Sequence, residues 1–380
     1  MLKYIFLGFS VKNTIRFQLF FQYQNIFSRF NLYRFLFSIH KYVPLLYRTQ
    51  KDKHMEKFKE LFDSFSNYSV LIIGDVMVDA YLWGSVERIS PEAPVPIVSV
   101  RKRENRLGGA ANVALNIKSL GGKPILCSII GDDEKGRIFL DLLEDQNMSN
   151  IGIICDKNRK TTTKTRVISG NQHCLRIDEE ISTPVTRRQE QTIIQQIDNI
   201  INEETINAII FEDYDKGAIS SEIIKAIVAI AAKKRIPISV DPKKRNFKEY
   251  KGVTLFKPNF KELCEGLRIE LQKEDFQSIH QNIQAFSNEM GIGHVMVTLS
   301  ELGMLITDGD RFYHEPTHIR EVADVSGAGD TVISVATMCL IAGIAVPEIA
   351  RISNIAGGLV CEHAGVVPIN KQKLLQEITR

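Results

Sequence analysis

The segment ADVSGAGDTV at residues 323–332 places two glycines and an alanine directly before an acid. Gly327, Ala328 and Gly329, here called the glycine turn, have little side chain to obstruct a ligand, and glycine adopts backbone angles closed to other residues. An apolar helical pattern follows at 331–342. The turn should therefore direct unpaired N–H groups, and the positive end of the helix dipole, at one point. A phosphate is the natural ligand of such a turn.

Asp330 follows the glycine turn and would repel a phosphate unless it has a task of its own. General-base catalysis is such a task, because the acid can accept the proton of a hydroxyl that attacks phosphorus while the turn neutralises the transferring group. An Asp at this position is equally typical of a helix cap. A single GxGD pattern therefore leaves catalysis and capping both open.

Short apolar runs alternate with helical patterns upstream of this turn. Strands are predicted at 70–74, 124–130, 208–211, 237–240 and 294–299, and helices at 109–120, 134–146, 187–202, 219–234, 275–289 and 331–342. Apolar strands that alternate with helices indicate a parallel sheet covered on both faces. We therefore expect one α/β domain over residues 55–380.

Two segments interrupt the alternation. Residues 81–105 contain three prolines, and residues 162–178 read as two strands around a Ser-Gly-Asn turn. Both are expected to be antiparallel additions outside the main sheet, which together form a small lid over a pocket.

The charge distribution separates the first fifty residues from the rest. They carry seven Lys or Arg and no acid, although the whole chain has a net charge of only +3. The remainder is therefore mildly acidic, which argues against a nucleic-acid partner. The six cysteines are scattered without a CxxC pair, a pattern typical of buried thiols in the reducing cytoplasm.

Residues 1–54 are rich in aromatic and basic residues. They contain neither an uncharged run of ~18–20 apolar residues, as a membrane span requires, nor a clear signal cleavage site. A transit peptide or surface-binding arm is one interpretation, and we prefer an extension that is not part of the fold. Deletion of 1–54 should then leave a soluble, active protein, and loss of activity on deletion would contradict this.

Further motifs occur in a fixed order with the glycine turn. They are GDVMVD (74–79), RLGGAANVALNIKSLGG (106–122), VDPKKRNF (240–247), KPNFKELCE (257–265) and VTLSELGM (297–304). In this order, from about residue 68 to the C-terminus, the chain resembles the ribokinase (PfkB) carbohydrate kinase family. The resemblance implies a ribokinase-like three-layer sandwich with a mostly parallel central sheet and a small antiparallel β lid. It also implies sugar kinase activity with Asp330 as the catalytic base beside the glycine turn.

The resemblance further assigns a sugar side and a nucleotide side. On the sugar side it implies Asp79 at the end of the first strand, Gly108, Gly109 and Asn112. Two carboxylate oxygens on Asp79 suit a vicinal diol. On the nucleotide side it implies ATP and Mg²⁺, with Glu262 holding the metal through water. The nucleotide-side residues are Asn259, Glu262, Asp241, Lys243, Thr298, Gly303 and Asn354. Asp324 and Ser326 lie where some members of the family bind a monovalent cation.

The segments RISPEAPVPIV (88–98), TKTRVISGNQHCLRID (163–178) and EDYDKG (212–217) resemble one branch of the family. That branch phosphorylates D-glycero-D-manno-heptose 7-phosphate at the anomeric hydroxyl, giving the 1,7-bisphosphate for ADP-heptose and lipopolysaccharide core biosynthesis. A phosphorylated sugar requires cations away from the reacting hydroxyl. Arg88, Arg106 and Arg166 are expected to supply them, because the guanidinium fork suits phosphate.

Many relatives carry a nucleotidyl-transferring domain after the kinase, and the sequence leaves no room for one after residues 363–365. A separate nucleotidyltransferase is therefore expected in the pathway. We also expect a cytoplasmic homodimer formed through the lid, without a membrane partner. The alternatives are a kinase for another sugar, such as a fructose phosphate or ribose, and a catalytically silent ligand-binding relative. A nicotinamide-dependent dehydrogenase is excluded, because GDVMVD and not GxGxxG follows the first strand.

Overall fold

The computed structural model describes residues 55–380 except 171 and 318–319. The predictions for residues 1–54 lie outside the described residues. The elements below belong to a compact unit that runs from Lys59 to Ile378. No helix in the described part of the chain is long and apolar enough to span a bilayer.

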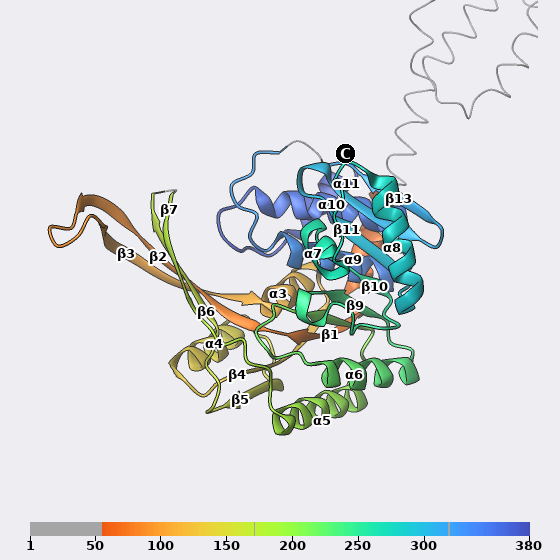
Figure 1. The fold of residues 1–380 in the computed structure, drawn as a ribbon, viewed down its shortest axis with the longest axis horizontal. Coiled ribbons are helices and arrows are strands. Elements are labelled where there is room, and N and C mark those ends of the chain that lie inside the picture. The colour runs from red at the N-terminus through yellow and green to blue at the C-terminus, as the bar shows by residue number, and fades with distance from the viewer. Residues whose placement is uncertain (1–54, 171, 318–319) are drawn as a thin grey trace, which may run out of the picture. The chain divides into compact units, whose positions relative to one another are not determined.

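A nine-stranded sheet forms the centre of this unit (Figure 1). Its strands are β1 (Ser69–Gly74), β4 (Lys123–Gly131), β5 (Gly152–Asp156), β8 (Ala208–Glu212), β9 (Ile238–Asp241), β10 (Leu255–Phe256), β11 (His294–Thr298), β12 (Met304–Asp308) and β13 (Arg311–Glu315). Their order is β13-β12-β11-β10-β9-β8-β1-β4-β5. Every pair from β5 to β11 is parallel, and β12 and β13 are antiparallel. The predicted mostly parallel sheet is confirmed.

Helices cover both faces of the sheet. They are α3 (Ala110–Leu120), α4 (Glu134–Asp145), α5 (Arg187–Glu203), α6 (Ser221–Lys234), α7 (Phe260–Leu267), α8 (Phe276–Met290), α9 (Ala328–Ile341), α10 (Val346–Cys361) and α11 (Lys371–Ile378), with 3₁₀ turns η3 (Phe65–Asn67), η4 (Lys244–Asn246) and η5 (Ser300–Leu302). Each helix predicted from the sequence is present. Helices α5 to α8 pack on one face, while α3, α9 and α10 contact strands from the other.

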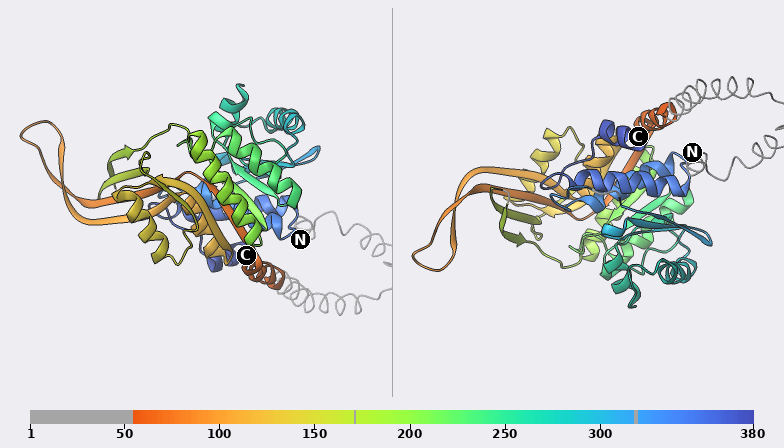
Figure 2. Two further views of the ribbon diagram at one scale, coloured as in Figure 1. Left: turned by 90° about the horizontal axis from the view of Figure 1, so that it is seen from below. Right: turned by 90° about the horizontal axis from the view of Figure 1, so that it is seen from above.

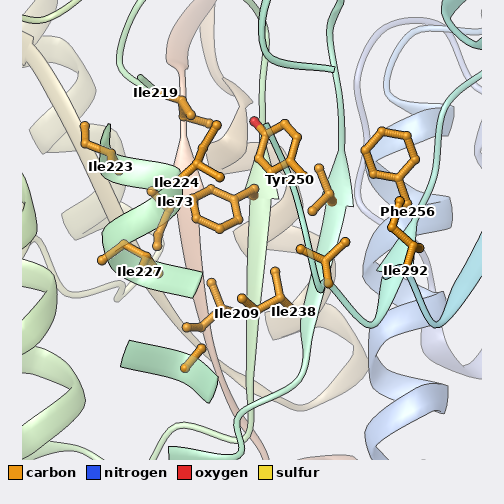
Figure 3. Close-up of a cluster of buried hydrophobic side chains, with 14 of the residues drawn as sticks. Ile73, Ile209, Ile219, Ile223, Ile224, Ile227, Ile238, Tyr250, Phe256 and Ile292 are labelled. Atoms are coloured by element: carbon orange, nitrogen blue, oxygen red, sulfur yellow. The ribbon is translucent and has the colours of Figure 1, made fainter. Parts of the chain in front are cut away.

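Alternate strand residues supply the two faces of the core. Leu71 and Ile73 of β1 point toward α5 and α6 and belong to one cluster of buried apolar side chains. The intervening Ile72 is also buried but is not part of that cluster. Figure 3 shows Ile209 and Ile238 of the sheet against isoleucines of α6. β-branched side chains suit strands that are buried on both faces, which explains why these strands appear in the sequence as continuous apolar runs.

The lid is a separate four-stranded sheet of β2 (Val76–Ile89), β3 (Pro96–Gly109), β6 (Thr163–Ser169) and β7 (Gln172–Glu179), in the order β3-β2-β6-β7. Both hairpins are antiparallel as predicted, but the pair that joins them, β2–β6, is parallel. The chain passes through α3, β4, α4 and β5 between the hairpins, and such a crossover lets β6 enter in either direction. Figure 2 shows the β2–β3 hairpin projecting well beyond the helices.

The position expected for Asp79 needs correction. Strand β1 ends at Gly74, and Asp79 lies inside β2, opposite Arg106 of β3 and Lys164 of β6. The chain remains extended after Asp75 and runs from the main sheet into the lid. Asp79 therefore belongs to the base of the lid, where two neighbouring strands bring basic side chains beside it.

Candidate active site

The glycine turn forms the N-terminus of α9. Gly327 caps the helix with φ +80°, and a Cβ there would lie 2.9 Å from Nδ2 of Asn112, so backbone and packing both require glycine. The N–H of Ala328 donates to the Val325 carbonyl at 3.3 Å. Among the described residues, no acceptor is found for the N–H groups of Gly327 and Gly329. These two amides on a partly exposed turn are available to an anion.

The Asp330 side chain is buried and held at both oxygens. Oδ2 accepts a hydrogen bond from Nδ2 of Asn112 at 2.7 Å, and Oδ1 accepts one from the Tyr214 hydroxyl at 2.6 Å. Burial raises the pKa of Asp330, and the two hydrogen bonds offset only part of that effect. Asp330 is thus an oriented and unusually basic carboxylate, rather than a side chain that caps its own helix.

Two further buried acids lie beside Asp330. Glu212 ends β8 and Asp241 ends β9, and each of the three residues places one carboxylate oxygen within 4.8 Å of the others. We call Glu212, Asp241 and Asp330 the acidic trio. Lys257, which follows β10, donates from Nζ to Oδ2 of Asp241 at 2.7 Å. Burial alone would lower the pKa of Lys257, but the negative charges of Asp241, Glu262 and Glu212 outweigh it and raise the pKa.

The ion pair of Lys257 and Asp241 lies against the glycine turn. A Cβ built on Gly329 would be 3.5 Å from both Lys257 Nζ and Asp241 Oδ2. The ends of β9 and β10 thus place a buried ammonium group beside the free amides of α9. An anion bound at the turn would meet backbone dipoles, the ammonium group of Lys257 and the Asp241 carboxylate that pairs with it.

The residues predicted for the nucleotide side form two groups. Asn259 and Glu262 make a capping box at the start of α7, Lys243 pairs with Glu262, and Thr298 bridges to Asn259. Gly303, with φ +88°, and Asn354 form the second group, around Pro316, whose carbonyl accepts a hydrogen bond from Asn354 Nδ2 at 2.8 Å. The groups adjoin, because the N–H of Leu299, directly after Thr298, donates to the Gly303 carbonyl at 2.7 Å. Asp241 belongs to the acidic trio, and the charges of Asp241 and Glu262 both raise the pKa of Lys243 and of Lys257, so the two acids act on the same pair of lysines.

The sugar-side residues meet at the base of the lid. Arg166 pairs with Asp79, and a Cβ on Gly108 would collide with the Asp79 carboxylate, so glycine leaves room for this pair. The guanidinium groups of Arg106 and Arg166 lie 4.7 and 5.4 Å from the centre of the Tyr81 ring. Cations from two strands are therefore gathered around one acid and one aromatic ring.

Three sugar-side predictions have other surroundings. Gly109 caps α3 with φ +60°, and a Cβ there would lie 2.4 Å from the Asp75 carbonyl oxygen. Asn112 is fully buried and holds Asp330. Arg88 is exposed near the end of β2, nine residues beyond Asp79, which corresponds to roughly 30 Å of strand. The structure therefore does not bring Arg88 to the other residues within one chain.

Sequence reasoning missed Glu212, Tyr214 and Lys257 as site residues. Tyr214 holds Asp330, and its ring lies 5.5 Å from the ammonium groups of both Lys164 and Lys243. Glu212 and Tyr214 occur within EDYDKG, directly after an apolar strand, where parallel sheets place ligand-binding residues. Their position at the end of a strand was the signal in the sequence that could have found them. Which acids from different strands meet, however, depends on the strand order.

The fold defines the class of protein. Escherichia coli phosphofructokinase-2 in complex with fructose-6-phosphate superposes with a TM-score of 0.67 at 19% identity, covering 82% of this chain and 99% of that chain. Arabidopsis thaliana ribokinase complexed with ribose and ATP superposes with a TM-score of 0.61 at 18% identity, covering 81% and 98%. The ribokinase-like fold predicted from the sequence is confirmed.

The chain belongs to the pfkB family of carbohydrate kinases, which it matches over residues 67–373. The prediction of a sugar kinase is therefore confirmed. The chain is 36% identical over 324 residues to the bifunctional protein HldE of Pelobacter propionicus, covering 85% of this chain. It is 38% identical over 296 residues to the protein of that name in Helicobacter pylori, covering 78% of this chain. It spans 66% and 63% of the length of these two relatives.

Proposed function

We propose that the chain transfers the γ-phosphoryl group of ATP to the anomeric hydroxyl of D-glycero-D-manno-heptose 7-phosphate, giving the 1,7-bisphosphate. The observation that carries this proposal is the position of Asp330. Its buried carboxylate lies at the start of α9, beside two free amides and the ammonium group of Lys257. A base and an anion site in contact are what phosphoryl transfer to an alcohol requires.

The chain's own residues have separate tasks in this reaction. Asp330 accepts the proton of the hydroxyl as its oxygen bonds to phosphorus and the bond to the leaving oxygen breaks. The amides of Gly327 and Gly329 and the ammonium group of Lys257 neutralise charge on the transferring group. Asn112 and Tyr214 keep the carboxylate oriented, so they are positioning residues.

The residues around Glu262 are proposed to hold the nucleotide and the metal. When bound, ATP would supply the phosphoryl group and Mg²⁺ would neutralise charge on the phosphates. Glu262 uses one oxygen for Lys243 and the other for the Asn259 N–H, and each oxygen retains a lone pair for a metal-bound water. Lys243, Thr298, Gly303 and Asn354 are proposed to line the nucleotide site.

A monovalent cation is proposed near Asp324. Asp324 lies on the loop before the glycine turn. Its carboxylate accepts hydrogen bonds from the N–H groups of Ser326 at 2.9 Å, on the same loop, and of Gly365 at 3.0 Å, after α10. Burial raises the pKa of Asp324, but these hydrogen bonds outweigh it and lower the pKa, so the group stays charged. One structure of E. coli phosphofructokinase-2, which has this fold, contains potassium.

The basic side chains at the base of the lid favour a sugar that already carries a phosphate. Arg106, Arg166 and Lys164 lie around Asp79 and Tyr81. Burial lowers the pKa of Lys164, and the charge of Asp79 opposes that effect. Glu104 also pairs with Arg106 at 2.7 Å, so three cations face two carboxylates. The remaining positive charge suits a phosphate, which a free sugar such as ribose lacks.

A panel of sugars with ATP tests the substrate. Heptose 7-phosphate, fructose 6-phosphate, fructose 1-phosphate, fructose and ribose are compared by kcat/KM. Trp83, the single tryptophan of the sequence, stacks 5.8 Å from Tyr81 and reports binding by fluorescence independently of turnover. Heptose 7-phosphate should give the highest kcat/KM. Turnover of ribose or a fructose phosphate without heptose turnover overturns the choice of sugar, and binding without any turnover supports a silent relative.

The remaining partners follow from this reaction. A heptose bisphosphate is a precursor of nucleotide-activated heptose, so a nucleotidyl-transferring activity would act downstream. ATP and sugar phosphates are cytoplasmic, and the six cysteines are free thiols, which fits that compartment. We propose a homodimer formed through the lid, whose exposed apolar residues include Val86, Ile89, Leu175 and Ile177.

A further inference from the structure

The acidic trio has a feature that the proposed reaction does not use. Glu212 is 1% exposed and Asp241 is 4% exposed, and they are paired in register at the ends of β8 and β9. Among the described residues, both oxygens of Glu212 and Oδ1 of Asp241 have no hydrogen-bond partner. Burying a carboxylate without a partner is strongly unfavourable, so a ligand that these oxygens bind is expected.

The local charges indicate the sign and size of that ligand. The three carboxylates of the trio and the carboxylate of Glu262 face two ammonium groups, those of Lys257 and Lys243. Lys243 pairs with Glu262, and Lys257 contacts Asp241 at Oδ2 and leaves Oδ1 free. Two negative charges remain in excess within a buried volume. A divalent cation balances them, and carboxylate oxygens are the ligands that Mg²⁺ and Mn²⁺ prefer.

We propose that Glu212, Asp241 and Asp330 form a divalent-cation site that binds metal without nucleotide and independently of Glu262. The placement of oxygens from all three residues within 4.8 Å of one another permits one cation to contact each of them, directly or through water. Glu212 is the distinguishing ligand, because neither of its side-chain oxygens has a hydrogen-bond partner in the part of the chain that the structure describes.

The site has a consequence that depends on the proposed function. The glycine turn lies 3.5 Å from Asp241 Oδ2, measured from a Cβ built on Gly329, so an entering triphosphate would approach uncompensated carboxylates. A cation held by the trio changes this repulsion into attraction. Metal binding itself does not depend on which sugar is phosphorylated.

A proton on Glu212 is the competing explanation. Burial, with the charges of Asp241 and Asp330, raises the pKa of Glu212 well above its ordinary value. A proton would remove one of the two excess charges. It would leave Asp241 Oδ1 charged and without a hydrogen-bond partner unless Glu212 turned to donate to it. The two explanations differ in whether the free protein binds metal.

The test is Mn²⁺ binding to the full chain in the absence of nucleotide. Binding is measured in electron paramagnetic resonance as the loss of the signal of free Mn²⁺. Wild type should bind about one Mn²⁺, and Glu212→Gln should weaken binding by at least about tenfold. Glu262→Gln should bind as wild type, as should Glu222→Gln, a matched change at an exposed residue of α6. Melting in chelator checks folding, and Glu212→Gln should melt no lower than wild type because it removes an unpaired buried charge.

Absence of Mn²⁺ binding by wild type overturns the site, as does equal binding by wild type and a folded Glu212→Gln. Such a result with heptose turnover intact leaves the proposed function standing. Conversely, Glu212-dependent Mn²⁺ binding in a protein that phosphorylates none of the sugars supports the site and rejects the function.

Discussion

At the scale of single residues, the environment of Asp330 decides its role. The sequence is compatible with a helix cap, but the side chain instead accepts hydrogen bonds from Asn112 and Tyr214, on two other segments. Burial raises its pKa toward the range in which a carboxylate is an effective base at neutral pH. Two residues hold this base, so its loss and its misorientation can be tested separately.

Asp330→Asn should lower kcat by roughly 10²- to 10⁴-fold, because the amide cannot accept the proton. Its oxygen and nitrogen can still occupy the same space, so the variant should still bind nucleotide. Steady-state kinetics and a nucleotide titration measure the two effects. Full activity of this variant would eliminate Asp330 as the base.

Tyr214→Phe keeps the ring beside Lys164 and Lys243 but removes the hydroxyl that bonds Asp330. That hydrogen bond lowers the pKa of Asp330, so its loss should raise the pKa further. Activity falls as the pH drops through the pKa of the base. The acidic limb of the kcat profile should therefore move to higher pH, with kcat reduced about three- to tenfold. A purely structural defect would reduce kcat without moving the limb.

At the scale of elements, one carboxylate fixes the loop that carries Tyr214. Asp75, directly after β1, accepts hydrogen bonds from the N–H groups of Tyr214 at 2.9 Å, Lys216 at 3.0 Å and Ala218 at 2.9 Å. The end of β1 thereby positions the segment that follows β8, its neighbour in the sheet. The base is held by Tyr214, and Tyr214 is held by Asp75.

Asp75→Ala should destabilise the protein by about 3 kcal/mol or more, because three N–H groups lose a charged acceptor. It should also lower kcat, since Tyr214 would no longer be fixed. Urea unfolding and kinetics measure the two effects. Asp145→Ala, at the exposed end of α4, is the matched control and should change neither. Unchanged stability of Asp75→Ala would show that the loop is held by other contacts.

At the scale of the whole molecule, the lid poses the question of assembly. Its β2–β3 hairpin projects away from the helices (Figure 2). Arg88 is the next-to-last residue of β2, close to the turn of this hairpin. Exposed apolar residues accompany it on the lid strands, including Val86 and Leu175. In the proposed homodimer, Arg88 would reach the sugar phosphate in the site of the partner.

Mixing two inactive variants tests this arrangement. Arg88→Ala and Asp330→Asn should each have low activity alone, and a mixture that exchanges subunits should regain activity. The mixed dimer contains one site with an intact Asp330 and an intact Arg88 from the partner. Gel filtration of Leu175→Glu should show a monomer. Full activity of Arg88→Ala would remove Arg88 from the site, and a monomeric wild type would contradict the dimer.

The sequence by itself determined the elements and the class of protein. Apolar runs of strand length and amphipathic helices depend on local periodicity, so β1, β4, β8, β9 and β11 were predictable, and the ordered motifs indicated the family. The glycine at residue 327 was predictable as the turn that starts α9, because its positive φ is a local backbone requirement.

Only the tertiary structure decided which acids meet. Glu212, Asp241 and Asp330 lie far apart in sequence, and the parallel order of β8 and β9 under α9 brings them together. The same packing places the Asn112 amide beside Asp330, and it places Asp79 at the base of the lid. Strand order depends on long-range packing, which periodicity along the chain does not encode.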